Sequence, residues 1–147
     1  MKADPRAIPP AAMTRQRWLI DLFLFGVAVQ FFLAGVGVFA TTKHPARRLA
    51  DASAFDAHRT VGNILILVSV VILGSGIAAR RQVPAALVLL LLTGLQSAWA
   101  HAGPDAPAVG AIHVLGAFAI TILAFTMHRN SRMQSQAPPR EHQPGGI

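Results

Sequence analysis

Histidine is the residue type in this sequence best suited to chemistry, and His58 and His113 are the leading candidates because both adjoin long apolar stretches. A neutral imidazole nitrogen is a common ligand of iron, copper and zinc. The chain has no cysteine, which excludes thiolate zinc sites, iron–sulfur clusters and haem attached through a C-x-x-C-H motif. No phosphate loop, nucleophile triad or paired-carboxylate motif is present. Histidine and carboxylate chemistry remain.

The elements that position these histidines are predicted to be transmembrane helices. Of the 147 residues, 53% are hydrophobic and only 13% are charged, which is atypical of a soluble domain. Four uncharged stretches each have about 20 residues, the length of a helix that crosses a ~30 Å hydrocarbon core. We predict one all-α domain, an integral membrane up-down four-helix bundle over 18–128, with helices at 18–40, 54–79, 84–101 and 106–128. Residues 1–17 and 129–147 are predicted to be disordered cytoplasmic tails.

The distribution of basic residues predicts the orientation of the bundle. With the N-terminus inside, the inner loops and tails hold nine of the thirteen Lys and Arg residues and the outer side holds four. Cytoplasmic loops are enriched in these residues, so both termini are expected in the cytoplasm of a cell-membrane protein. The net charge of +7 then reflects membrane topology and not a nucleic-acid partner. The run ending at Ala40 has the form of a signal-peptide cleavage site, but it is longer than a typical signal-peptide core.

Each predicted helix carries one stripe of small or polar residues, which should face the bundle interior. His58 and Gly62 share such a stripe on the second helix, Gln96 lies on that of the third, and His113 with the flanking Gly116 lies on the fourth. Short loops place the second and fourth helices on a diagonal and parallel to each other. The two histidines can then face each other as axial ligands of one haem iron, with small neighbours leaving room. Close helix packing is the alternative explanation of the stripes.

The candidate residues allow other arrangements as well. Counted from the inner charged ends, His58 and His113 differ in depth by about 9 Å, which tilt or a longer fourth helix would reduce. His101 is therefore an alternative partner for His113, and His44 could join these histidines in a copper or zinc site. Arg59 could pair with a haem propionate or extend to the membrane interface.

Two further titratable groups are expected to have structural or solvated positions. Asp21 follows Arg17 by one helical turn, so an i,i+4 ion pair at the membrane interface is preferred to a proton-carrying carboxylate. His128 at the inner helix end and His142 in the tail are expected to be solvated.

Three segments resemble one half of haem A synthase, a membrane protein built from two four-helix halves. They are residues 55 to 62, which read FDAHRTVG, the region of Gln96, and Ile112 with His113. The resemblance implies that His58 and His113 ligate b-type haem. Phe55 stands where that family commonly has glutamate, so the oxidative activity does not transfer with the motif. Residues 17 to 130 also resemble a family of small, uncharacterised prokaryotic four-helix membrane proteins.

These observations favour a multi-pass membrane protein that binds one b-type haem for electron transfer or haem handling, exchanging electrons with a membrane redox partner or quinone. Whether it is an enzyme is left open. A cofactor-free accessory subunit or scaffold of a membrane complex is the alternative from another class. A small transporter ranks last, because no inverted repeat or broken helix is evident.

Overall fold

The computed structural model describes residues 10–42, 51–102 and 107–136, and every element in these ranges is a helix. The elements are α1 (Pro10–Thr42), the single turn α2 (Asp51–Ala54), α3 (Asp56–Ala79), α4 (Val83–Ala102) and α5 (Pro107–Gln136). The predicted all-α fold with four long helices is confirmed.

Four of these helices are long and apolar enough to cross a membrane. The spans are Thr14–Ala40 in α1, Asp56–Ala79 in α3, Val83–Ala100 in α4 and Ala111–Met133 in α5. Their outward faces are apolar too, with side chains such as Leu67 and Ile122 largely exposed on the bundle. An apolar surface of this extent requires lipid around it, so the chain is a multi-pass membrane protein.

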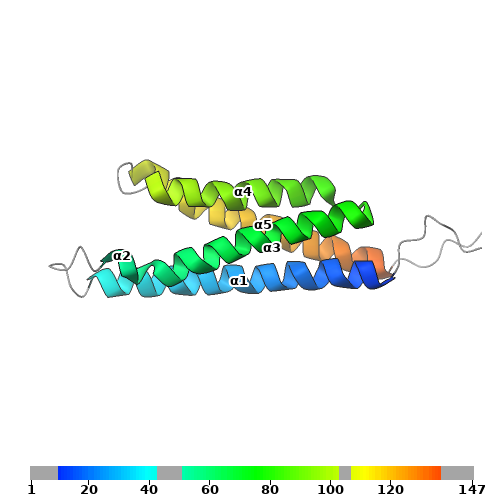
Figure 1. Cartoon of the computed structure of the whole chain (residues 1–147), viewed down its shortest axis with the longest axis horizontal. Helices are drawn as coiled ribbons and strands as arrows, with labels where there is room; N and C mark the ends of the chain where they lie inside the picture. The colour runs from blue at the N-terminus through cyan, green and yellow to red at the C-terminus, as the bar shows by residue number, and fades with distance from the viewer. Residues whose placement is uncertain (1–9, 43–50, 103–106, 137–147) are drawn as a thin grey trace, which may run out of the picture.

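The helices form an up-down bundle in which α1 and α4 each pack against both α3 and α5 (Figure 1). The helices α3 and α5 therefore lie on a diagonal, as the short connections predict. We call the end where α1 begins at Pro10 and α5 ends at Gln136 the terminal end, and the opposite end, at Thr42 and Pro107, the distal end.

The hydrophobic core occupies the half of the bundle nearer the terminal end. Large side chains with no exposed surface come from three helices, and they include Phe23, Ile72 and Leu89. The cluster they form is completed by Ile20, Val27, Leu65, Ala86, Ile120, Ala124 and Met127. One turn beyond Val27, Leu65 and Ile120, toward the distal end, the inward positions are Gln30, Gly62 and Gly116, of which only Gly116 is buried. The apolar core therefore ends before it reaches the level of the histidines, which lie nearer the distal end.

Two helix ends differ from the sequence prediction. Residues 10–17 are helical, because Pro10 suits the first position of a helix and Gln16 is buried in the bundle. Residues 129–136 are helical as well, so α5 does not end at His128. Here Ser131 is buried, and contacts with the α3–α4 turn hold the segment against the bundle.

An ion pair and a histidine meet at the terminal end of α1 and α5. Arg17 lies 4.0 Å from Asp21 across one helical turn, which confirms the predicted pair. The prediction for His128 was wrong: its ring is mostly buried and its Nδ1 contacts a carboxylate oxygen of Asp21. The physical reason is the extension of α5, which keeps His128 within the packed helix instead of at its end.

The tight turn between α3 and α4 is fastened to α5 by one side chain. Arg80 and Gln82 both adopt positive φ angles, of 51° and 52°, which lets the chain reverse within three residues. The Gln82 amide donates to the Ser131 hydroxyl at 3.0 Å and to the Met127 carbonyl at 3.4 Å. These bonds join the turn to a helix more than forty residues away in sequence.

Replacing Gln82 with alanine is expected to lower the free energy of unfolding by about 1 kcal/mol, the net contribution of a typical hydrogen bond. The measurement is denaturant unfolding in detergent micelles, followed by circular dichroism. Thr126→Ala is the matched control, because the Thr126 hydroxyl is exposed and bonds only to a carbonyl of its own helix. Equal stability of the Gln82 variant and the unchanged chain would show that the turn does not depend on this contact.

Candidate functional site

His58 and His113 meet in the interior of the bundle near its distal end. His58 lies in the first turn of α3 and His113 in the second turn of α5. Their ring centroids are 6.2 Å apart and the ring planes are inclined by 65°. The predicted approach across the diagonal is therefore observed, without the expected difference in depth. The expected difference in depth came from taking Arg129 as the inner end of the last helix, whereas α5 continues to Gln136.

A backbone carbonyl fixes the orientation of each ring. Nδ1 of His58 lies 3.2 Å from the Gln30 carbonyl oxygen of α1, and Nδ1 of His113 lies 3.1 Å from the Gln96 carbonyl oxygen of α4. A carbonyl oxygen only accepts hydrogen bonds, so Nδ1 is the protonated nitrogen in both neutral rings. The lone pair is then on Nε2, the nitrogen left for a ligand. Metal-binding histidines in proteins are commonly oriented this way.

Glycine lets each glutamine side chain lie close to the helix that carries the histidine. A Cβ atom added at Gly62 would be 2.9 Å from Nε2 of Gln30. A Cβ atom added at Gly116 would be 2.7 Å from Nε2 of Gln96 and 2.8 Å from Cζ3 of Trp99. A side chain at Gly62 would displace only the flexible end of Gln30, whereas one at Gly116 would displace both the Gln96 amide and the Trp99 ring.

The two helix pairs thus contribute equivalent sets of residues. The pair α1 and α3 supplies Gln30, His58 and Gly62, and the pair α4 and α5 supplies Gln96, His113 and Gly116. In each set the glutamine carbonyl accepts from the imidazole, and its amide packs over the glycine. The second set contains the predicted Gln96 and Gly116. The first set adds Gln30, whose carbonyl contact with His58 no residue type in the sequence indicates.

Both glutamine side chains carry buried polar atoms without a hydrogen-bond partner. Oε1 of Gln30 and both Oε1 and Nε2 of Gln96 are in this state. These atoms therefore form no hydrogen bond between helices. A buried polar group without a partner costs about 1–3 kcal/mol. These groups lie beside two half-buried imidazoles at the same level of the bundle.

Aromatic side chains flank the histidine pair. The ring of Phe55, just before α3, stands edge-on to the His58 ring with centroids 6.4 Å apart. It also packs over Gly37 of α1, where an added Cβ would lie within 3 Å of three ring carbons. Trp99 of α4 packs against Gly116, one turn from His113 on α5.

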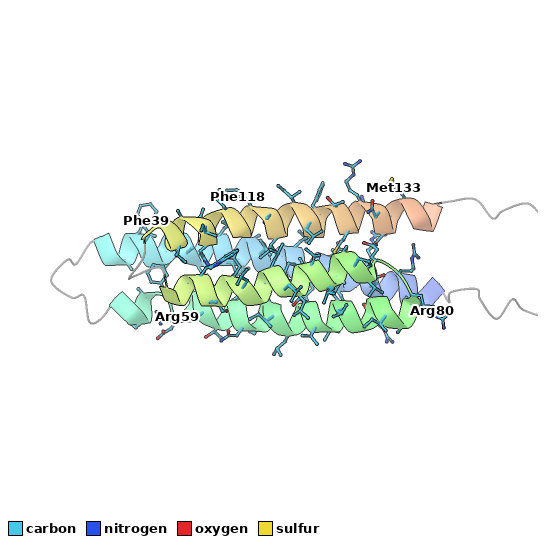
Figure 2. All side chains as sticks on the ribbon, turned by 90° about the horizontal axis from the view of Figure 1, so that it is seen from above. Phe39, Arg59, Arg80, Phe118 and Met133 are labelled. Atoms are coloured by element: carbon cyan, nitrogen blue, oxygen red, sulfur yellow. The ribbon has the colours of Figure 1, made fainter. Side chains whose placement is uncertain are left out.

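The remaining predicted site residues are not brought to the histidine pair. Arg59 forms an ion pair with Asp56 at 3.0 Å, and its side chain is exposed on the outside of the bundle (Figure 2). The side chains of His44 and His101 lie outside the described residues. Among the side chains that the structure does describe, no three His, Asp or Glu residues form a group able to hold a metal ion.

The chain matches no family model, no curated protein and no solved structure. The chemistry of the site therefore follows from its own geometry. Two neutral imidazoles, each with Nδ1 engaged by a backbone carbonyl, offer two nitrogen lone pairs from opposite corners of the bundle. Such a pair can occupy two opposed positions around one metal centre.

Proposed function

We propose that this protein binds one b-type haem between His58 and His113 and serves in electron transfer or haem handling. The observation that carries the proposal is the spacing and orientation of the two rings. Metal–nitrogen bonds of about 2 Å place two opposed imidazole centres roughly 6 Å apart, and the observed separation is 6.2 Å. The resemblance of residues 55 to 62 and of Ile112 with His113 to haem A synthase implies the same ligands.

The residues around the histidines fit a flat, largely apolar group. Apolar packing ends at Val27, Leu65 and Ile120, on the side of the histidines that faces the terminal end. Gly62 and Gly116 carry no side chain at that level, where the amides of Gln30 and Gln96 lie against them, and the unpartnered amide atoms of Gln96 could bind a polar edge. When bound, the haem would supply one-electron redox chemistry that the side chains lack.

The protein's own groups would tune the site through the imidazoles. The carbonyls of Gln30 and Gln96 hold each ring in one orientation and, by accepting the Nδ1 hydrogen, make Nε2 a stronger donor. Phe55 and Trp99 would limit the access of water. A bis-histidine site of this kind leaves no open coordination position, which favours electron transfer over oxygen chemistry.

We further propose that the site lies toward the outer leaflet, with the terminal end in the cytoplasm. The terminal end carries basic residues on α1, on α5 and in the turn between α3 and α4, whereas the only basic residue among the described distal residues is Arg59. The terminal set is Arg15, Arg17, Arg80, Arg81, Arg129 and Arg132. This asymmetry follows the rule that cytoplasmic membrane flanks are rich in Lys and Arg.

Adding haem to the purified protein in detergent is expected to give one low-spin, six-coordinate haem per chain. The signs are a sharp Soret band that saturates at a one-to-one ratio and an α-band that appears on reduction. Two neutral imidazoles produce this state because both axial positions are filled by strong nitrogen donors. The measurement is an absorption titration with a pyridine haemochrome assay of the bound haem.

The control for adventitious binding is the same titration with the detergent alone and with an unrelated four-helix membrane protein that lacks histidine pairs. A high-spin spectrum, or haem that is removed as easily as from empty micelles, would contradict the proposal. The histidine pair would then be a packing contact of a cofactor-free scaffold.

A further inference from the structure

The interior residues of α1 are repeated along α4. Gln30 of α1 and Gln96 of α4 are 66 positions apart in the sequence, and the same offset relates the four described buried residues of α1 before Gln30 to residues in α4 or immediately before it. The pairs are Gln16 with Gln82, Ile20 with Ala86, Phe23 with Leu89, and Val27 with Thr93. Glutamine stands at both ends of each series, and all four glutamines have buried amide atoms without a hydrogen-bond partner. The two helices therefore carry the same interior pattern.

A second fixed offset relates the interior residues of α3 to those of α5. His58 and His113 are 55 positions apart, and the next four buried residues of α3 each have a buried counterpart in α5 at that offset. The pairs are Leu65 with Ile120, Ser69 with Ala124, Ile72 with Met127, and Gly76 with Ser131. The two offsets differ because the site glutamine and histidine are 28 positions apart in the first helix pair and 17 in the second. The bundle therefore consists of two equivalent pairs, α1 with α3 and α4 with α5.

The two pairs are related by a half-turn about the long axis of the bundle. The helices α1 and α4 run in one direction and α3 and α5 in the other, and each of these couples lies on a diagonal (Figure 1). A half-turn about the axis therefore exchanges α1 with α4 and α3 with α5. The site contacts follow this relation, because the two distances from Nδ1 to the carbonyl are 3.2 and 3.1 Å. Gly62 and Gly116 make the same contact with a glutamine amide, although Gly116 is one residue closer to its histidine.

We propose that the site does not distinguish the two faces of its ligand, so that bound haem occupies two orientations related by this half-turn. The inference rests on the proposed function. With one imidazole on each face, the haem plane stands across the line from α3 to α5, and the two side edges of the haem point toward α1 and α4. A half-turn exchanges both the faces and the side edges, and it brings each of them against an equivalent set of residues. The two orientations are distinct species, because the vinyl groups of haem are not placed symmetrically.

The residues that meet the two side edges differ little in size and polarity. Val27 on the α1 side and Thr93 on the α4 side have the same shape, and the Thr93 hydroxyl donates to the Leu89 carbonyl of its own helix at 2.7 Å. Gln30 and Gln96 each have a buried Oε1 without a partner. The two orientations should therefore have similar free energies, with equilibrium populations that differ by less than about tenfold.

Proton NMR of the oxidised, haem-loaded protein in detergent micelles tests the proposal. Paramagnetic iron moves the haem methyl resonances away from those of the protein. We expect two sets of these resonances, with intensities that differ by less than about tenfold once their ratio no longer changes with time. The control is a synthetic haem that is symmetric about the axis between its two propionates, which should give one set.

The outcomes separate this inference from the proposed function. A low-spin haem with one set of methyl resonances, or with a ratio beyond tenfold, would overturn the inference and leave the histidine ligands in place. Two sets that persist with the symmetric haem would also overturn it, because they would come from two conformations of the protein. Absence of low-spin haem in the absorption titration would remove both.

Two variants of matched size provide a second readout. Val27→Ala and Thr93→Ala remove side-chain volume at equivalent positions on the α1 side and the α4 side of the site. Room made on one side favours the orientation that room on the other side disfavours, so the ratio should move several-fold and in opposite directions. Thr126→Ala, at an exposed position of α5, should leave the ratio unchanged. No shift in either variant, or shifts in the same direction, would show that the two helix pairs are not equivalent at the site.

Discussion

Replacing either His58 or His113 with alanine is expected to abolish the low-spin haem spectrum of the purified protein. Each ring supplies one of the two axial nitrogens that we propose, and its partner lies across the bundle with ring centres 6.2 Å apart. Loss of one ring leaves the iron with a single strong ligand, so any haem that remains should be high-spin. Its affinity should fall at least 100-fold, because losing a residue that only orients a metal ligand already lowers affinity roughly 10- to 100-fold. The measurement is the absorption titration repeated on each variant.

Two further variants separate ligation from folding. His128→Ala removes a mostly buried histidine at the terminal end and should leave the haem spectrum unchanged. His58→Met keeps an axial ligand of another kind, so haem should stay bound while the spectrum changes and the reduction potential rises. Haem spectra that are identical in the unchanged chain and in both histidine-to-alanine variants would refute the ligand assignment.

The fold was predictable because one physical quantity dominates it, the length of apolar helix that crosses a bilayer. Uncharged stretches of about 20 residues define the helices, and short connections define the diagonal between α3 and α5. Helix ends were less predictable, because they depend on contacts between distant residues. The Gln82 amide holds Ser131 of α5 from across the bundle, and no pattern around Ser131 signals that partner.

The candidate site was predictable in its side chains and not in its backbone. His58, His113, Gln96 and the two glycines follow from stripes on helix faces. The acceptor of each Nδ1 hydrogen is a main-chain carbonyl, which every residue has, so no residue type could indicate it. The contact of His128 with Asp21 was missed for a related reason, since it depends on the relative shift of α1 and α5 along their axes.

Enlarging Gly116 is expected to weaken haem binding by roughly 10- to 100-fold, the range found when a partner that orients a metal ligand is lost. A Cβ atom at this position meets both the Gln96 amide and the Trp99 ring at less than 3 Å, so Gly116→Leu must push α4 away from α5. The Gln96 carbonyl moves with α4, and the His113 ring loses the acceptor of its Nδ1 hydrogen. Titration of Gly116→Leu with haem gives the affinity, and circular dichroism gives the helix content.

Gly74→Leu is the matched control, because it makes the same change on α3 at a position where an added Cβ meets nothing within 4 Å. It should bind haem as the unchanged chain does. Its stability should change little, and any change should be a gain, because leucine favours helix more than glycine does. The smaller substitution Gly62→Ala should have an intermediate effect, because only the flexible end of Gln30 lies in its way. Equal haem affinity in the Gly116 and Gly74 variants would show that the contact between Gln96 and α5 does not position His113. The imidazole would then have to be oriented by the iron itself.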